Sequence, residues 1–317
     1  MAKKDVIAAQ LTLCAIVWDV MKVEESETER LEREIIDYHI LKLAVPEKKK
    51  MEDIKERYSC ICRKLAAAGI LESHALLVTE DAELAAYAGK PCKEETTEIF
   101  QGMGAVYYER EGNRKDIAAD MIVQGFEEVG VQFLDRIHKR KNGLPWNILY
   151  TKRTCVREIT LTDLDALYEL YAQEGITDFT EPLYERPEEE EYTKNYIKYM
   201  YYYYGYGMWV VCDRDTGKVI GRAGIEHREE GNETLMELGY IIDRKYQGKG
   251  LATEVCQAII EYATTELTIE QLHCFIHPQN KASIHVAEKL GFIRCDLPEN
   301  QGRCQGKITW LHYTMQF

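Results

Sequence analysis

The chain has 317 residues and a formal net charge of −14, and hydrophobic residues make up 45% of it. This length is long for one domain and comfortable for two, each able to bury its own core. The acidic charge argues against nucleic acid as a primary partner, because phosphate backbones require basic faces, and it is compatible with a cationic amine as a ligand.

The ten cysteines are scattered along the chain. In a chain far larger than a small secreted domain, this spacing indicates reduced thiols in the cytoplasm. Cys60 and Cys62 have no second pair at the spacing of zinc ligands, so we expect no metal site. The apolar run at residues 6–18 is too short to span a bilayer, and we interpret it as a core element of a cytoplasmic protein without a membrane partner.

The first half of the chain alternates between helical and strand patterns. Apolar residues recur with a helical period over residues 24–45, and a second helix-prone stretch opens at residues 48–50, after Pro46. Residues 75–79 form an apolar run typical of a buried strand. The other predicted elements are a helix at 81–88 closed by Gly89, a strand starting at 90–92, a strand at 119–123 and a helix at 126–140.

The first predicted strand ends at Asp19. In this respect the N-terminal half weakly resembles the Rossmann-like core of haloacid dehalogenase-type hydrolases, whose first strand also ends in an aspartate. That family needs a second aspartate two residues on, as proton donor and magnesium ligand, and this chain has Met21 there. We therefore predict a non-catalytic, Rossmann-like α/β domain at residues 1–145, which modulates, positions or dimerises. A phosphohydrolase domain is the alternative.

A connector rich in basic residues, Gly and Pro at residues 139–145 marks the domain boundary. A strand at 154–159 and a helix opened by residues 162–165 follow it, and Pro187 starts a second helix. Strands at 209–212 and 219–225 form a hairpin around the turn at 213–217. The remaining elements are a strand at 235–242, a helix at 252–266, a strand at 272–276, a helix from Asn280 to Gly291, and strands up to Phe317.

The most informative segment spans residues 240–252, which predict a strand, a Gly-rich turn and the start of a helix. Gly248 and Gly250 let the backbone approach an anion closely, and the free amides and positive dipole end of the following helix attract it. Positive side chains in this otherwise acidic chain gather at the same turn, namely Arg244, Lys245 and Lys249. The turn therefore predicts a pyrophosphate site.

A second segment at residues 280–292 makes the first one specific. The pattern Gln247…Gly250-x-Ala252, followed by Asn280…Ser283…Lys289-Leu290-Gly291-Phe292, resembles the GNAT superfamily of N-acetyltransferases, and its second part resembles the branch that acetylates the N-termini of ribosomal proteins. The resemblance covers residues 153–317. It implies an α+β domain with a mixed, mostly antiparallel central sheet, and acetyl-coenzyme A as co-substrate.

The resemblance also implies roles for particular residues. The pyrophosphate would be held by the turn, which consists of Gln247, Gly248, Lys249, Gly250, Leu251 and Ala252. Ile241 and Ile242 would pair with the amide-bearing pantetheine arm, and an amide near Ile242 would polarise the thioester carbonyl. For Asn280 we expect two roles at once, as helix cap and as hydrogen-bond partner of the cofactor arm.

Acetyl transfer to an amine also requires a base and a proton donor. Glu237, on the strand before the turn, is the candidate base, with Glu226 in reserve; the alternative is a carboxylate paired across the sheet. Many GNAT enzymes have a tyrosine as general acid where this chain has Ala287, so Ser283 is the candidate donor. Ser283 is equally consistent with a role in capping its helix.

Two unusual runs each have two interpretations. The tyrosine-rich run at residues 199–209 is either an acceptor groove or core packing at a helix end. The acidic run at 188–191 is either a rim that attracts amines or, more simply, a helix start that favours carboxylates.

We predict an acetyltransferase for amines, with protein N-termini first, small cationic amines second and lysine side chains third as acceptors. Two alternatives are a coenzyme A-binding sensor whose transferase site has decayed, and a bifunctional protein with a hydrolase in its N-terminal half. Oligomeric state, including a homodimer, is left open.

Overall fold

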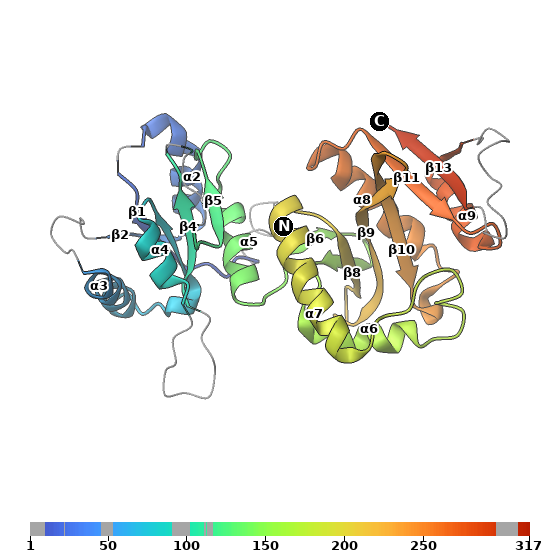
Figure 1. The fold of residues 1–317 in the computed structure, drawn as a ribbon, viewed down its shortest axis with the longest axis horizontal. Helices are drawn as coiled ribbons and strands as arrows, with labels where there is room; N and C mark the ends of the chain where they lie inside the picture. Colours follow the sequence, from blue (N-terminus) through green and yellow to red (C-terminus); the bar gives the residue numbers. More distant parts are fainter. Residues whose placement is uncertain are drawn as a thin grey trace. The chain divides into compact units, whose positions relative to one another are not determined.

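The computed structural model describes residues 10–21, 23–45, 53–90, 102–110, 112, 117–295 and 310–317. Its internal contacts divide the chain into two compact units, residues 1–144 and 145–317. Each unit has its own sheet and its own apolar core (Figure 1). Within the described ranges, no helix is both long and apolar enough to cross a membrane.

The N-terminal unit is an α/β sandwich around a five-stranded sheet of order β2-β1-β3-β4-β5, in which every pair of neighbouring strands is parallel. Its strands are β1 (Ala15–Asp19), β2 (Leu41–Ala44), β3 (Ala75–Thr79), β4 (Gly104–Tyr108) and β5 (Met121–Val123). Its helices are α2 (Glu25–Asp37), α3 (Ile54–Ala67), α4 (Ala82–Ala88) and α5 (Val131–Lys141).

Alternating side chains of these strands bury both faces of the sheet. Ile16 packs in one core with residues of α2 and α5, whereas Val17 packs in the other with residues of α3 and α4. A parallel sheet covered by helices on both faces is what the strand and helix patterns predict for an α/β domain. The more specific assignment as Rossmann-like stays a prediction.

Several predicted boundaries in this unit are wrong. The predicted helix at residues 24–45 ends at Asp37 because His39 adopts a positive φ of 57°, and the chain then forms β2. The last helix begins at Val131 rather than at residue 126, after a turn in which Val129 N–H bonds to the carbonyl of Phe126. Strand β4 has no counterpart in the prediction. The strand predicted to start at 90–92 and the stretch at 48–50 fall wholly or mostly outside the described residues.

The C-terminal unit has an eight-stranded sheet of order β12-β13-β11-β10-β9-β8-β7-β6, antiparallel except for the pair β10–β11. Its strands are β6 (Asn147–Tyr150), β7 (Thr154–Arg157), β8 (Met208–Asp213), β9 (Val219–Glu230), β10 (Glu233–Ile242), β11 (Gln271–Ile276), β12 (Ile293–Arg294) and β13 (Leu311–Gln316). Its helices are α6 (Leu164–Tyr171), α7 (Arg186–Tyr196), α8 (Leu251–Thr265) and α9 (Lys281–Leu290), and a π-helical segment at Ile197–Tyr204 continues α7.

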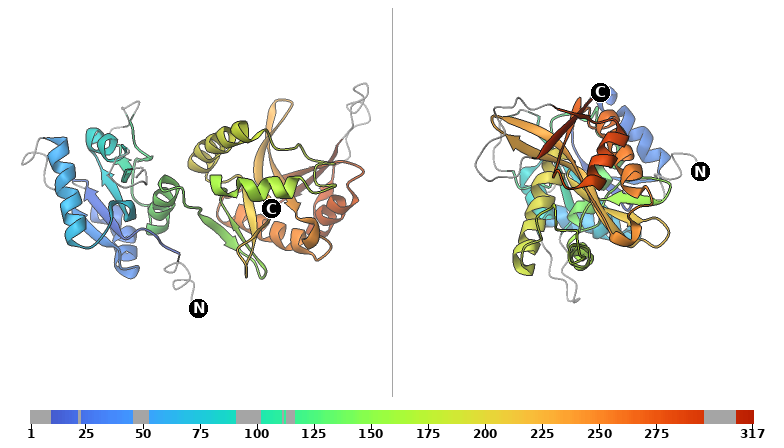
Figure 2. Two further views of the ribbon diagram at one scale, coloured as in Figure 1. Left: turned by 90° about the horizontal axis from the view of Figure 1, so that it is seen from below. Right: turned by 90° about the vertical axis from the view of Figure 1, so that its right-hand side faces the viewer.

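The helices of this unit cover opposite faces of its sheet, as can be followed in Figure 2. On one face Arg222 of β9 contacts Tyr171 of α6, and on the other Tyr240 of β10 contacts the backbone of Ser283 in α9. The buried core beneath α8 includes an edge-to-face pair of Trp209 with Tyr262.

The mixed, mostly antiparallel sheet predicted for this unit is confirmed. One local prediction needs correction: the helix predicted to open at residues 162–165 is preceded by a 3-10 turn at Leu161–Asp163, and α6 has Asp163 at its N-cap. Thr160 and Asp163 form a reciprocal capping box at this 3-10 turn, and Asp163 also pairs with Arg157. Strand β6 has no counterpart in the sequence prediction.

Candidate active site

The turn that follows β10 is held in shape by Asp243, the first residue after the strand. Its buried carboxylate accepts hydrogen bonds from the backbone amide of Lys245 (2.8 Å) and from the side-chain amide of Gln173 (2.9 Å). Gly248 and Gly250 then adopt φ angles of 70° and 74°, which residues with a Cβ rarely adopt. The chain thereby enters α8, with Gly250 as the N-cap.

The backbone amides of this turn have no acceptor in the part of the protein that the structure describes. No oxygen there bonds to the N–H groups of residues 248–252, and the N-cap Gly250 has no side chain to bond them. A Cβ added to Gly248 or Gly250 would meet no atom within 4 Å, so the space beside them is open. Free amides at the N-terminus of a 15-residue helix form an anion site, and they fit a diphosphate.

The side chains of two cationic residues donate hydrogen bonds to backbone carbonyls of this turn. Lys249 Nζ donates to the carbonyl of Lys245 (2.7 Å), and Arg153 donates to the carbonyl of Lys249 (2.9 Å). Arg153 is itself fixed by an ion pair with Glu254 in the first turn of α8 (2.6 Å). Of the cations predicted to attract an anion, Arg244 pairs with Glu174 (3.0 Å) and Lys249 bonds within the turn, so a direct contact of Lys249 with phosphate stays a prediction.

The side chain of Gln247 connects the turn to the end of β10 through a hydrogen bond. Its amide donates to the carbonyl of Ile242 (2.8 Å), so it supports the turn in this structure, and its contact with phosphate stays a prediction. Beside the turn lies a polar hollow lined by Glu174, Gly175, Asp178, Arg244 and Gln247.

Strands β10 and β11 meet and then part. They run parallel, and their register among the described residues is defined by one pair, Glu237 with His273. Beyond that pair β10 continues to Ile242. Successive residues of a strand direct their N–H groups to opposite neighbours, and the N–H of Asp243 bonds to Ile220 of β9, so the N–H of Ile242 faces the β11 side. This edge suits an amide-bearing ligand.

The helix that faces this edge begins at Asn280. The Asn280 side chain accepts a hydrogen bond from the backbone amide of Ser283 (3.1 Å), so the capping role is observed. The hydroxyl of Tyr240 donates to the carbonyl of Ser283 (3.3 Å) and thereby ties β10 to the start of α9. The roles of Asn280 and Ser283 toward a cofactor stay predictions.

Glu237 lies on β10 directly opposite Glu226 of β9, on the face covered by α6 and α7. Its carboxylate pairs with Arg228 across the two strands (3.1 Å). Burial raises the pKa of Glu237 above its usual value, although Arg228 acts in the opposite direction. A raised pKa makes this carboxylate a better base, and the arginine gives it the cross-strand partner that the alternative interpretation expects.

Glu226, the reserve candidate, is held by a tyrosine that the sequence analysis did not single out. Its carboxylate accepts a hydrogen bond from the hydroxyl of Tyr196 (2.8 Å), and that hydroxyl accepts one from the amide of Met208 (2.6 Å). The two neighbouring carboxylates, Glu226 and Glu237, thus have separate partners, Tyr196 and Arg228. This offsets the repulsion expected between like charges placed opposite each other on adjacent strands.

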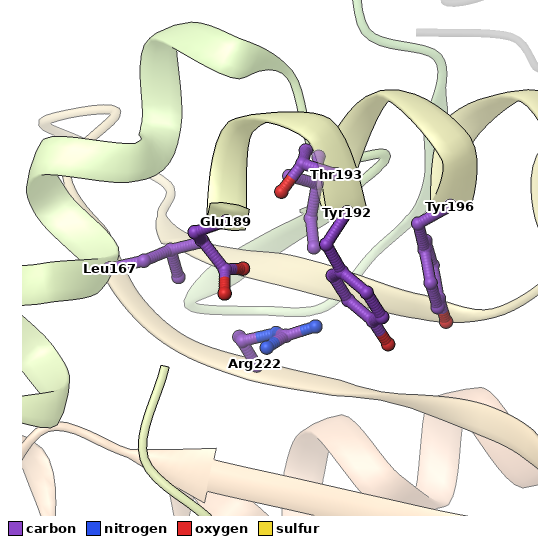
Figure 3. Close-up of a pocket in the computed structure, with 7 residues that line it drawn as sticks. Leu167, Glu189, Tyr192, Thr193, Tyr196 and Arg222 are labelled. Carbon is purple, nitrogen blue, oxygen red and sulfur yellow. The ribbon is translucent and has the colours of Figure 1, made fainter. Parts of the chain in front are cut away.

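A small pocket lies beneath α7 on the same face of the sheet. In Figure 3, Glu189 and Tyr192 project from α7 toward Arg222 on β9. The pocket has room for about one water molecule. Its full lining is Ile159, Leu167, Glu189, Tyr192, Thr193, Tyr196 and Arg222.

The sequence contained only a partial signal for this pocket. One glutamate of the acidic run, Glu189, is buried at 4% exposure because the helical period turns it inward. In the tyrosine-rich run, Tyr201 is fully buried and Tyr203 is 80% exposed, so that run divides between core and surface. The pocket tyrosines, Tyr192 and Tyr196, precede the run.

In the N-terminal unit, Asp19 ends β1 and is enclosed by polar partners. Arg57 of α3 pairs with Asp19 (3.0 Å) and with Asp81 (2.6 Å), and its side chain is 1% exposed. The hydroxyl of Thr79 donates to Asp19 (2.6 Å). In this structure the carboxylate of Asp19 is therefore paired with a buried guanidinium.

Comparison with known proteins tests the family assignment. The acetyltransferase (GNAT) domain family matches residues 153–293. The N-acetyltransferase YnaD of Bacillus subtilis (strain 168), whose function is uncharacterized, is 30% identical over 152 residues, which cover 45% of this chain and 81% of YnaD. The chain belongs to the GNAT acetyltransferase family.

Other relatives match over shorter stretches. The uncharacterized protein YkkB of the same bacterium is 40% identical over 88 residues, which are 28% of this chain and 51% of YkkB, so this match spans about half the length of that relative. Among solved structures, an acetyltransferase from Agrobacterium tumefaciens str. C58 is 25% identical with a TM-score of 0.44, covering 53% of this GNAT protein and 94% of the other chain.

The predicted GNAT resemblance of the C-terminal half is thus confirmed. The matched region includes the glycine turn and the Asn280 helix. It does not include the N-terminal unit, whose resemblance to haloacid dehalogenases stays a prediction.

Proposed function

We propose that the GNAT unit, residues 153–317, transfers the acetyl group of acetyl-coenzyme A to a primary amine. The observation that carries this proposal is the row of backbone amides at residues 248–252, which have no acceptor among the described residues and lie at the N-terminus of α8. These amides would bind the diphosphate of the co-substrate. The supporting residues are Gln247, Gly248, Lys249, Gly250, Leu251 and Ala252.

The thioester end would lie along the edge where β10 and β11 part. There the backbone of Ile242 and the capping side chain of Asn280 would bind the amides of the pantetheine arm. By the same alternation the backbone N–H of Ile241 faces β9, so the role predicted for Ile241 at this edge is not supported. The N–H of Ile242, directed to the β11 side, would donate to the thioester carbonyl oxygen as it gains negative charge during attack by the amine. Coenzyme A serves here as the carrier of the acetyl group.

Protons would move through two side chains. The amine nitrogen forms the new bond to the acetyl carbon, and Glu237 accepts the proton that the amine loses, directly or through water. The carbon–sulfur bond then breaks, and the Ser283 hydroxyl gives a proton to the departing sulfur as it takes one from water. A thiolate with a pKa of about 8.5 needs only mild assistance. The raised pKa of Glu237, caused by burial, supports its role as base.

The acceptor class sets how strong the base must be. At pH 7, deprotonating an α-amine with a pKa of about 7.7–8.0 costs about 1–1.4 kcal/mol, whereas a lysine-like amine with a pKa of about 10.4 costs about 4.6 kcal/mol. An arginine-paired carboxylate such as Glu237 suits the first task better. We therefore propose protein N-termini or small amines as acceptors.

Two measurements on the full chain test this function. Calorimetry with coenzyme A and with pantetheine, which lacks the diphosphate, should show binding of the first at least about 100-fold tighter, because several charge-assisted hydrogen bonds of about 1.5–3 kcal/mol each depend on the diphosphate. Thiol release from acetyl-coenzyme A should then require an added amine. Equal affinity for both ligands would refute the diphosphate site, and binding without turnover on any amine would favour the sensor alternative.

For the N-terminal unit we propose a non-catalytic role. Arg57 neutralises Asp19 and Asp81 at the edge of the sheet, which supports this assignment. Magnesium-dependent release of phosphate from a generic phosphomonoester, abolished in Asp19→Asn, would contradict it.

A further inference from the structure

The segment that follows α6 is bonded to the chain just after β10. Helix α6 ends at Tyr171, and Gln173 lies two residues beyond it. The side chain of Gln173 donates to the carboxylate of Asp243 (2.9 Å) and accepts from the backbone amide of Arg244 (3.0 Å). The partners Gln173 and Asp243 are 70 residues apart in the sequence. The contact therefore joins a helix on the Glu237 face of the sheet to the strand end that leads into the free amides at residues 248–252.

These two bonds together require a side chain that donates at one atom and accepts at another. The carboxylate of Asp243 needs a donor, whereas the N–H of Arg244 needs an acceptor, so the two partners fix the orientation of the Gln173 amide. A glutamate at position 173 would repel Asp243 when ionised. An apolar side chain would bond to neither group.

The buried carboxylate of Asp243 depends on this amide. Asp243 is 6% exposed, and its two oxygens have separate donors: Oδ1 accepts from the backbone amide of Lys245 (2.8 Å), and Oδ2 accepts from Gln173. Removal of the Gln173 amide would take the donor from Oδ2 and cost free energy. The ion pair of Arg244 with Glu174, which joins the same two segments, lies between exposed side chains and contributes less.

Asp243 in turn determines the path of the backbone toward the free amides. Its carbonyl accepts hydrogen bonds from the amides of Tyr246 (2.8 Å) and Gln247 (3.2 Å), and Asp243 is the N-cap of the 3-10 turn Arg244–Tyr246. Gly248 follows directly, so the position of this 3-10 turn sets where the amides of residues 248–252 lie. Several donors that bind one ligand must be held by the groups behind them, since a small displacement weakens every bond.

We propose that Gln173 is a positioning residue of the coenzyme A site, which holds the amides of residues 248–252 in place through Asp243. This inference rests on the proposed function, because it requires these amides to bind a diphosphate. It assigns part of the affinity for the diphosphate to the segment after α6, through contacts that lie entirely within the protein.

A comparison of coenzyme A with pantetheine separates this role from a general loss of structure. Gln173→Met keeps the length of the side chain and removes both hydrogen bonds. Calorimetry should show about 10-fold weaker binding of coenzyme A, because the bonds to the diphosphate lose their alignment, and an unchanged affinity for pantetheine. The matched control is Gln271→Met, which should change neither affinity. Gln271 also donates to a side chain, that of Thr314 (2.8 Å), but it lies at the start of β11, at the opposite end of the parallel pair from the turn.

The ratio of the two affinities decides the outcome. A ratio in Gln173→Met equal to that of the native protein, whether neither affinity falls or both fall together, would overturn the inference. Failure of the native protein to bind coenzyme A more tightly than pantetheine would instead contradict the proposed function itself.

Gln173→Glu gives a second test, whose effect depends on pH. Near pH 7 the introduced carboxylate faces Asp243, and the repulsion should weaken coenzyme A binding by about 10-fold or more relative to the native protein. The same repulsion raises the pKa of the introduced carboxyl above the usual value of about 4.3, and once protonated it can donate to Asp243 as the glutamine does. The deficit relative to the native protein should therefore shrink as the pH falls to about 5. An equal deficit at both pH values, or no deficit at either, would overturn the inference.

Discussion

Both units have charged or polar groups at the ends of strands, but the two sets of groups differ in whether they have bonding partners within the protein. In the N-terminal unit, β1 ends at Asp19. The carboxylate of Asp19 pairs with Arg57 and accepts a hydrogen bond from Thr79, and Arg57 also pairs with Asp81. We call this strand end the closed edge. In the GNAT unit, the end of β10 leads into residues 248–252, whose backbone amides have no acceptor in the described structure. We call this strand end the open edge. The groups at the first edge bond to one another, whereas the amides at the second edge are free to bind the proposed ligand.

This difference indicates which groups contribute to stability and which are available for binding. Groups that satisfy one another inside a protein stabilise it and have little capacity left for a ligand. Groups without partners contribute little to folding but are ready to bind. Substitutions at the first edge should therefore change unfolding, and substitutions at the second should change binding and turnover.

The largest expected effect is at the closed edge. Arg57→Met leaves the partly buried carboxylates of Asp19 and Asp81 without their cation, so it should lower the stability of the N-terminal unit by about 3 kcal/mol. Hydrogen exchange measured by mass spectrometry should accelerate in peptides covering β1 and β3 and stay unchanged in peptides covering β9. The control is Arg63→Met, an exposed residue of the same helix. Unchanged protection of β1 would show that the ion pairs contribute nothing to stability, and the contrast between the two edges would fail.

The next effect is at the open edge. Gly250→Val places a branched side chain at a φ of 74° beside the free amides, so it should weaken coenzyme A binding by about 100-fold. Calorimetry measures this directly. The matched control is Gly217→Val, because Gly217 has a φ of 71° and open space around it but lies in the β8–β9 turn. Equal losses of affinity in both variants would attribute the effect to backbone strain and not to the turn.

The contrast between the edges also explains what the sequence could predict. Gly248, Gly250 and the Asn280 segment lie in short stretches whose backbone conformation depends on the local residues, and the turn, its helix and the Asn280 cap all appear in the structure. The GNAT assignment followed from these local patterns.

Groups brought together by tertiary folding escaped prediction. Arg222 meets Tyr171 from 51 residues away, and Arg57 meets Asp19 across 38 residues, so no sequence spacing indicates either contact. Strand β4 begins at Gly104, well after the strand start predicted at 90–92, and the end of the helix at Asp37 depends on the unusual backbone of His39. The choice between base and cross-strand ion pair for Glu237 likewise depends on Arg228, which only the sheet register identifies.

A smaller effect distinguishes the two acids that pair with arginine. Glu237→Gln should lower kcat for an α-amine acceptor by about 30-fold, because a base then has to come from solvent, whereas Asp19→Asn should leave transfer unchanged. Coenzyme A affinity should be the same in both variants.

The pH profile gives the sign of this effect. Glu237 accepts a proton only when ionised, so the rate of the native protein should rise as pH increases through its pKa, which burial places above the usual value for a glutamate. Glu237→Gln should lose this limb of the profile. Persistence of the same limb in the variant would assign the base to another group, with Glu226→Gln as the next variant to measure.

The smallest effect concerns two helix caps, one in each unit. Asn280 caps α9 through the amide of Ser283, and Asp53 caps α3 through the amide of Glu56 (2.8 Å), so Asn280→Ala and Asp53→Ala should each cost about 1 kcal/mol of stability in their own unit. If Asn280 also binds the cofactor arm, only its variant should in addition weaken coenzyme A binding, by about 5- to 10-fold. Thermal unfolding and calorimetry on the same samples separate the two contributions. Unchanged affinity in Asn280→Ala would show that this residue acts only as a helix cap. The proposed coenzyme A site would then include the glycine turn but not the start of α9.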